Sequence, residues 1–240
     1  MKIKGVFFDL GGTLFRYTSH LGAGFKHLVS QLDININLEE IGDAWTKASK
    51  KAALHFGRKS FFLHKDLFRE MIVSFGDSFD YKVSESLIEE FHQNQLKVLL
   101  QHMPIRDDCI STLKELRLMG LYLSIVSNID DDYLEPIMKK YSLDLLFDDW
   151  SSSEEAKSCK PDSHIFYYAL NKSGLKKEEV LFVGDSLEHD VAGSHAVGMR
   201  SAHIAEEGAV TPLTHGLKIT TQPTFKIAEL AELIPLIQET

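Results

Sequence analysis

The stretch that most constrains this chain runs from Val6 to Leu14 and reads Val-Phe-Phe-Asp-Leu-Gly-Gly-Thr-Leu. The residues from Ile3 to Phe8 are mostly apolar, with Lys4 among them, and predict a short buried strand. Asp9 therefore stands at the carboxyl end of a strand, where ligands bind in open α/β sheets. The two glycines after it allow close approach of the backbone to a ligand. An ordinary turn gives the same pattern, because Asp and Gly are common turn residues.

Three further apolar runs predict strands later in the chain: Leu121–Val126, Val180–Val183 and Met199–Ile204. Helical patterns separate them, and a last helix is expected over Ile227–Ile237. The short apolar run Leu143–Phe147 is ambiguous. Strands that alternate with helices predict right-handed βαβ units, and hence an α/β fold whose parallel sheet is covered on both faces.

A long helical segment interrupts this alternation directly after the first strand. Four amphipathic helices are predicted there, over Leu21–Leu32, from Asn37 to Gly57, over Phe62–Phe75 with Gly76 as its stop, and from Ser84 onward. Helices joined by short loops predict a small bundle. We therefore expect an α/β core domain made of residues 1–15 and 102–240, and an inserted helical domain made of residues 16–101.

Composition narrows the possible partners. The formal net charge is -9 and the pI is near 5.6, which argues against nucleic acid or an anionic membrane surface as the main partner. Cys109 and Cys159 are far apart and have no metal-ligand spacing, so neither a disulfide framework nor a zinc site is predicted. No apolar run approaches the roughly 20 residues of a membrane span. We expect a cytoplasmic protein with a small-molecule partner, and the sequence leaves its oligomeric state open.

Polar residues follow three of the predicted strands. They are Asp9, the pair Ser127 and Asn128, and Asp185, while Lys160 opens a loop between the second and third of these positions. Because the carboxyl ends of parallel strands share one edge, these groups are expected to converge on one crevice. Two carboxylates suit Mg²⁺, and a hydroxyl with an ammonium suits a phosphoryl group. With Asp9 as nucleophile, the predicted chemistry is formation of an acyl phosphate followed by its hydrolysis.

Four short motifs occur here in a fixed order. They are Phe8–Leu14, Val126–Asn128, Lys160–Asp162, and Gly184–Ser186 with Asp190. In these motifs the chain resembles the haloacid dehalogenase-like (HAD) hydrolases, a superfamily that consists mostly of magnesium-dependent phosphatases. The resemblance implies a Rossmann-like core, and it implies that the helical insertion is a cap domain that covers the site and selects the substrate.

The resemblance also implies a role for each matching residue. The catalytic residues would be Asp9, the nucleophile, and Lys160. The phosphate-binding groups would be Gly12, Ser127, Asn128 and Lys160. The ligands of Mg²⁺ would be Asp9, Gly11 and Asp185, with Thr13, Ser186 and Asp190 in support. The predicted function is hydrolysis of a small phosphorylated metabolite through an aspartyl phosphate on Asp9.

One position departs from the family pattern. Phosphatases of this family usually carry a second aspartate two positions after the nucleophile, as general acid and base, and here that position is Gly11. The backbone carbonyl that the family uses there as a metal ligand is retained, but proton transfer by the side chain is lost. Such help is typically worth about 10²–10⁴ in rate, so we expect slower turnover and least loss with good leaving groups.

Three other functions remain open at this point. Dehalogenases and phosphonate hydrolases also resemble this family and also replace the second aspartate. Asp185 after Gly184 looks like the metal-binding form of the fourth motif, which a metal-free dehalogenase does not need. A phosphonate hydrolase needs a Schiff-base lysine in the cap, and the pattern singles none out. Retention of Asp9, Ser127, Lys160 and Asp185 argues against a catalytically silent binding protein.

Overall fold

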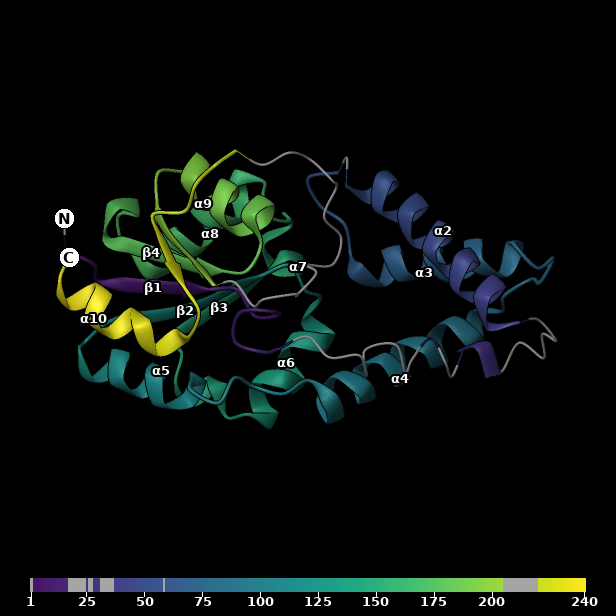
Figure 1. Ribbon diagram of the computed structural model, residues 1–240, viewed down its shortest axis with the longest axis horizontal. Helices are drawn as coiled ribbons and strands as arrows, with labels where there is room; N and C mark the ends of the chain where they lie inside the picture. Colours follow the sequence, from purple (N-terminus) through teal and green to yellow (C-terminus); the bar gives the residue numbers. More distant parts are fainter. Residues whose placement is uncertain (1, 17–24, 26–27, 31–36, 58, 205–219) are drawn as a thin grey trace. The chain divides into compact units, whose positions relative to one another are not determined.

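The computed structural model describes residues 2–16, 25, 28–30, 37–57, 59–204 and 220–240 (Figure 1). The chain forms two compact units, one made of residues 1–17 and 104–240 and the other of residues 18–103. Of the predicted helix Leu21–Leu32, residues 25 and 28–30 are described and are helical, and the rest lies outside the described residues. No helix within the described ranges is both long enough and apolar enough to cross a membrane.

A parallel sheet of six strands forms the centre of the first unit, in the order β3-β2-β1-β4-β5-β6. The strands are β1 (Gly5–Phe8), β2 (Tyr122–Ser127), β3 (Asp149–Ser152), β4 (Val180–Gly184), β5 (Arg200–Ile204) and β6 (Phe225–Ile227). Every residue of β1 is buried, as expected for a strand with a neighbour on each side and covered faces. The parallel α/β fold predicted from the sequence is confirmed.

Helices cover both faces of this sheet (Figure 1). They are α5 (Cys109–Leu118), α6 (Asp131–Lys140), α7 (Ser153–Ala156), α8 (Ser163–Ser173), α9 (Gly193–Ala196) and α10 (Leu233–Gln238). On one face α8 packs against β2 and β3 and contacts α9, and on the other α5 packs against β2 and contacts α10. Phe166 of α8 meets Phe182 of β4 with ring centroids 5.2 Å apart, in a core cluster that also contains Phe7 and Val126.

The two outermost strands were not predicted. The ambiguous run Leu143–Phe147 contains a short 3₁₀ helix over Leu143–Leu145, and β3 follows it. The sequence of β3, Asp-Trp-Ser-Ser, has no apolar periodicity, which an edge strand does not need. At the other edge, Ile227 ends β6, so the prediction of a helix from this residue was wrong; a 3₁₀ turn over Leu230–Glu232 and α10 follow.

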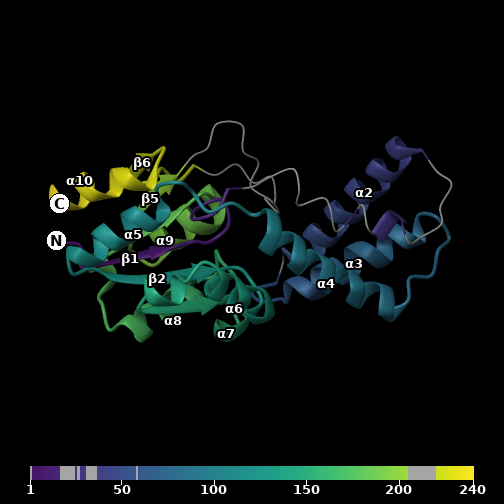
Figure 2. The same ribbon diagram turned by 90° about the horizontal axis from the view of Figure 1, so that it is seen from below.

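The second unit contains α2 (Leu38–Phe56), α3 (His64–Asp77) and α4 (Glu85–His102), shown from a second direction in Figure 2. The side chains of Asn37 and Ser84 accept hydrogen bonds from the first turns of α2 and α4, as their cap positions predict. Gly76 does not stop α3 but lies within it. A Cβ there would stand 2.7 Å from the carbonyl oxygen of Tyr81, so the glycine serves close packing.

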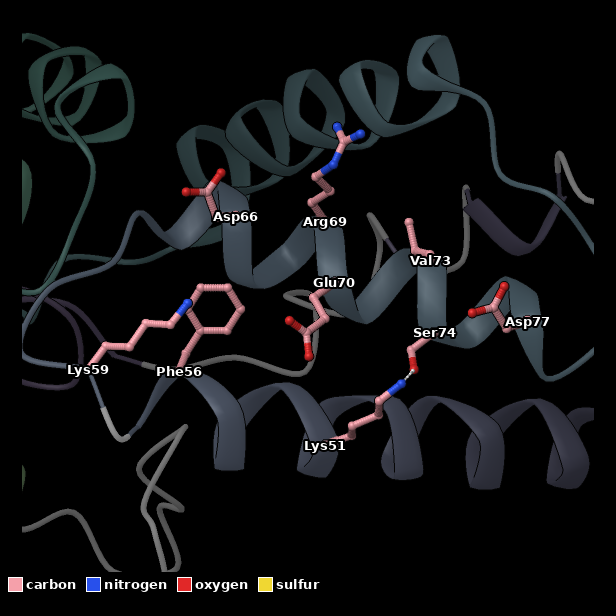
Figure 3. A pocket seen from close by; sticks show the side chains of 9 residues that line it. All are labelled: Lys51, Phe56, Lys59, Asp66, Arg69, Glu70, Val73, Ser74 and Asp77. Atoms are coloured by element: carbon pink, nitrogen blue, oxygen red, sulfur yellow. Dashed lines mark hydrogen bonds between the residues drawn. The ribbon is translucent and has the colours of Figure 1, made fainter.

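A groove of about 500 Å³ lies on the second unit (Figure 3). Its lining residues are Lys51, Phe56, Lys59, Asp66, Arg69, Glu70, Val73, Ser74 and Asp77. Side chains of both signs of charge line it, and two of them already have partners: Lys51 donates to Ser74 over 3.0 Å, and Glu70 accepts from His55 over 2.6 Å. The residues that the motifs single out all belong to the first unit, whereas the residues that line this groove belong to the second.

Candidate active site

Three neighbouring strands deliver polar side chains to one edge of the sheet. Asp9 follows β1, Ser127 ends β2, and Asp185 follows β4. The backbone N–H of Asp9 donates to the carbonyl of Val183 over 2.9 Å, which fixes the start of the loop after β1. The hydroxyl of Ser127 donates to Asp9 Oδ1 over 3.0 Å, although the two residues are 118 positions apart. The convergence expected from the parallel sheet is therefore present between these two side chains.

Lys160 lies between two carboxylates. Its Nζ is 2.6 Å from Asp9 Oδ1 and 2.6 Å from Asp190 Oδ1, and its side chain is almost completely buried. Burial disfavours the charge of the ammonium, but the attraction of Asp190 and Asp9 outweighs it, so the pKa of Lys160 is raised above its ordinary value. The lysine is a fixed positive charge beside the candidate nucleophile.

Asp190 is positioned by an unusual helical turn. A π-helix runs from Leu187 to Ala192, with the hydroxyl of Ser186 accepting from the N–H of His189 at its start. The backbone N–H of Ser186 donates to Asp190 Oδ2 over 2.9 Å, so both oxygens of Asp190 have a partner. Burial raises the pKa of Asp190 to about 6, and the nearby charge of Asp9 adds to this effect, while Lys160 opposes it. A Cβ on Gly184 would stand 2.3 Å from Asp190 Cγ, so only glycine leaves room for this carboxylate.

Three carboxylates could hold a divalent cation. Asp9, Asp185 and Asp190 each offer an oxygen, and these oxygens lie within 4.8 Å of one another. Hard oxygen donors in this number suit Mg²⁺, which keeps several of its waters. The ligands predicted from the sequence are Asp9, Gly11 and Asp185, and Asp190 is predicted to have a supporting role. Both oxygens of Asp190 accept hydrogen bonds, one from Lys160 and one from Ser186, and its supporting role stays a prediction.

The loop after Asp9 turns back on itself at once. Gly12 has a φ of 79°, a left-handed conformation that favours glycine, whereas Gly11 is not among the described glycines with positive φ. The N–H groups of Leu14 and Phe15 both donate to the carbonyl of Leu10. Thr13 thereby places its hydroxyl 3.4 Å from Asp9 Oδ2, at the long limit of a hydrogen bond.

Asn128 uses its side chain on the backbone of Lys160. Its Nδ2 donates to the carbonyl of Lys160 over 2.9 Å, and its Oδ1 accepts from the N–H of Lys160 over 2.6 Å. The sequence placed Asn128 among the phosphate-binding groups. In this structure both polar ends of the side-chain amide hold the loop that carries Lys160, and phosphate binding by Asn128 stays a prediction.

The buried residue Arg106 lies near this loop and was not predicted from the sequence to belong to the site. Arg106 is 2% exposed and donates to the carbonyls of Gly12 and Thr13, both over 2.9 Å. It stands 94 positions after Gly12 and outside the four motifs, and no periodicity marks it. Only the pairing of distant backbone segments brings it here.

A protein-family model described as haloacid dehalogenase-like hydrolase matches residues 6–204. The glyceraldehyde 3-phosphate phosphatase of Methanocaldococcus jannaschii is 29% identical over 206 residues, which cover 84% of this chain and 85% of that protein. The phosphoglycolate phosphatase of Pasteurella multocida is 24% identical over 246 residues, which cover 99% of each.

Solved structures with dehalogenase and hydrolase names share the fold. The magnesium-bound HAD-hydrolase YfnB of Bacillus subtilis superposes with a TM-score of 0.78 at 18% identity and covers 99% of this chain and 100% of its own. The L-2-haloacid dehalogenase of Xanthobacter autotrophicus superposes with a TM-score of 0.72 at 22% identity over 98% of each chain. At these identities the likeness concerns the fold alone.

Proposed function

This chain belongs to the haloacid dehalogenase-like hydrolases, and on that premise we propose that it is a Mg²⁺-dependent phosphatase of a small phosphorylated metabolite. The observation that carries the proposal is the contact of Asp9 with both Ser127 and Lys160, beside a second carboxylate on Asp185. A nucleophilic carboxylate, two donors for phosphoryl oxygens and a metal-binding set are the parts that phosphoryl transfer needs. Relatives named as phosphatases of small phosphorylated compounds support the substrate class.

The proposed reaction has two steps. In the first, a carboxylate oxygen of Asp9 attacks phosphorus, and the bond from phosphorus to the leaving oxygen breaks with its electron pair. In the second, a water oxygen attacks the same phosphorus, and the bond to Asp9 breaks to restore the carboxylate and release phosphate. Lys160 stays protonated throughout and offsets the charge on the phosphoryl oxygens, while Ser127 orients them. Bound Mg²⁺ would supply further neutralisation of that charge.

We propose that the second unit is the family's cap. It is inserted between the loop after β1 and the start of α5, and it consists of helices, as the predicted cap over 16–101 does. Its place in the chain supports a role in substrate selection. We further propose that the enzyme acts in the cytoplasm, because Cys109 and Cys159 are buried and neither is in a disulfide, which suits a reducing compartment.

The decisive test of the proposed function is a phosphate-release screen over sugar, carboxylic acid and aryl phosphates, with Mg²⁺ and with a chelator in its place. We expect release that depends on the metal. Release of halide from 2-haloacids in the chelator would instead identify a dehalogenase, and metal-dependent cleavage of a carbon–phosphorus bond would identify a phosphonate hydrolase. An absence of turnover in every arm would contradict the proposal.

Asp185→Ala is expected to weaken Mg²⁺ binding. Lys160 pairs with Asp9 and Asp190, so the loss of Asp185 removes a candidate ligand and leaves both carboxylates of that ion pair in place. We expect the dissociation constant to rise by more than the roughly 10–100-fold that loss of an outer-shell partner costs. Titration calorimetry with Mg²⁺ measures it, with Asp144→Ala, at an exposed position of the same unit, as control. An unchanged affinity in Asp185→Ala would place the metal elsewhere.

Gly11→Asp is expected to restore the missing proton carrier. Wild-type turnover should depend steeply on the pKa of the leaving group, because an aryl oxide leaves without a proton and an alkoxide does not. The variant should raise turnover on alkyl phosphates by about 10²–10⁴ and change aryl phosphates much less. Gly11 is not in the positive-φ conformation of Gly12, so its backbone accepts a side chain without that strain.

The control for this variant is Gly11→Ala, which adds a Cβ without a carboxyl group. We expect it to fold and to show no gain on alkyl phosphates. If a folded Gly11→Asp gains nothing, and if wild-type rates are insensitive to the leaving group, then another residue or a water already carries the proton. Melting temperatures of both variants accompany the kinetics.

A further inference from the structure

Arg106 is the largest side chain among the fully buried residues of the described chain. A buried guanidinium must be hydrogen-bonded, because an unpaired charge in the interior costs several kcal/mol. Here Nε donates to the carbonyl of Thr13 and Nη2 to the carbonyl of Gly12, each over 2.9 Å. The rigid guanidinium of Arg106 thus binds two consecutive carbonyls of the loop after Asp9.

The backbone around Arg106 is tied to the same loop. The N–H of Arg106 donates to the carbonyl of Leu14, and the N–H of Arg16 donates to the carbonyl of Pro104, both over 2.9 Å. Phe15 and Ile105 form an antiparallel bridge between these two bonds. The segments where the chain leaves and re-enters the first unit therefore pair with each other, and the guanidinium extends this pairing toward Asp9.

This arrangement fixes the orientation of the peptide groups in the loop. In a trans peptide the N–H points opposite to the C=O, so holding the carbonyls of Gly12 and Thr13 also sets the directions of the next two N–H groups. Glycine at position 12 would otherwise leave the loop many conformations. A guanidinium presents its donors in a fixed plane, whereas a lysine offers a single point of charge and cannot hold both carbonyls with the same geometry.

We propose that Arg106 is a positioning residue for the nucleophile. It holds the turn Gly11–Thr13 in one conformation, so that the Asp9 carboxylate, the carbonyl of Gly11 and the hydroxyl of Thr13 keep a constant geometry through both steps of the reaction. The inference rests on the proposed function for its kinetic consequence, but its structural content, a loop ordered by one arginine, is independent of what the enzyme hydrolyses.

The test compares Arg106→Met, Arg106→Lys and wild type. Methionine is similar to arginine in length along its unbranched chain and carries no charge, but it donates nothing to the two carbonyls. We expect kcat on an aryl phosphate to fall about 10²-fold, the cost of a small misplacement of reacting groups, with a KM change of less than about threefold. Lysine, which can reach one carbonyl, should give an intermediate kcat.

A second readout does not need turnover. Amide hydrogen exchange of the segment 10–15 should become at least about tenfold faster in Arg106→Met, while exchange in β2 and β4 stays unchanged. Arg117→Met is the matched control, because Arg117 also donates to a backbone carbonyl, that of Leu146, and to Asp148, outside the loop after Asp9. It should leave both kcat and the exchange of 10–15 at the wild-type value.

The outcomes separate cleanly. If Arg106→Met folds and both its kcat and the exchange of residues 10–15 are unchanged, the proposal is wrong. It is also wrong if neither Arg106 variant folds, because Arg106 would then serve the stability of the whole fold. If only Arg106→Met fails to fold, the decision falls to Arg106→Lys. A wild-type kcat in Arg106→Lys would overturn the proposal, and a reduced kcat with a near-native melting temperature would support it. If the wild-type protein shows no metal-dependent release of phosphate, the proposed function is wrong. The exchange measurement would still decide the role of Arg106.

Discussion

Asp9→Asn is expected to lower kcat by on the order of 10⁴-fold or more while the fold stays intact. An amide has nearly the shape of a carboxylate but is a poor nucleophile and a weaker ligand for Mg²⁺. The backbone bond from Asp9 to Val183 does not involve the side chain and should survive. Turnover on an aryl phosphate and a melting curve measure the two parts of this expectation.

The matched control is Asp144→Asn, an identical change at an exposed position of the first unit. It should leave both turnover and the melting temperature at the wild-type values. Asparagine deamidates slowly to aspartate, so the residual activity of Asp9→Asn should be measured on freshly purified protein and checked by mass. Activity of the intact amide variant within tenfold of wild type would remove Asp9 from the mechanism.

Lys160→Met is expected to damage both stability and catalysis. The ammonium separates Asp9 from Asp190, and all three side chains are at least nine-tenths buried. Removing one partner of a buried ion pair typically costs about 3–5 kcal/mol, because it leaves uncompensated charge in the interior. We expect a loss of that size in urea denaturation at neutral pH, and a fall in kcat/KM of about 10²–10³ from the lost stabilisation of phosphoryl oxygens.

Lys172→Met provides a close comparison for Lys160→Met. Lys172 also lies between two carboxylates, 2.9 Å from Asp149 Oδ1 and 3.1 Å from Glu155 Oε1, but about a quarter of its side chain is exposed. Ion pairs of this kind contribute about 0–1 kcal/mol. We expect a small loss of stability and unchanged kinetics. If the two substitutions had equal effects on stability and kinetics, the ion pairs of Lys160 with Asp9 and Asp190 would contribute no more than the exposed ion pairs of Lys172.

The main features of the sheet and of the candidate site could be predicted from the sequence because they follow from chain direction. Once Ile3–Phe8, Leu121–Val126 and Val180–Val183 are assigned to one parallel sheet, Asp9, Ser127 and Asp185 must emerge at one edge. The structure brings Asp9 and Ser127 into direct contact and adds Lys160 to them. The catalytic roles of these residues stay predictions.

The rest depended on contacts that no local pattern encodes. The edge strand β3 is polar, and β6 has three residues, so neither carries an apolar signal. The carboxylate of Asp190 reaches Lys160 through a π-helix, whose extra residue in the turn is invisible in a search for helical periodicity. Arg106 and the side chain of Asn128 act on backbone atoms far along the chain, which residue type alone does not reveal.

The two hydrogen bonds between the side chain of Asn128 and the backbone of Lys160 have a consequence for insertions into the segment between these residues. The backbone of Lys160 is held by the side chain of Asn128, a residue 32 positions earlier that directly follows Ser127. Between α6 and β3, Leu143 and Phe147 are buried, but Asp144 and Leu145 are exposed, and we expect an insertion at these two positions to leave the lysine in its place beside Asp9. A designer who wishes to extend the protein can test these two positions, which are separate in sequence from the second unit.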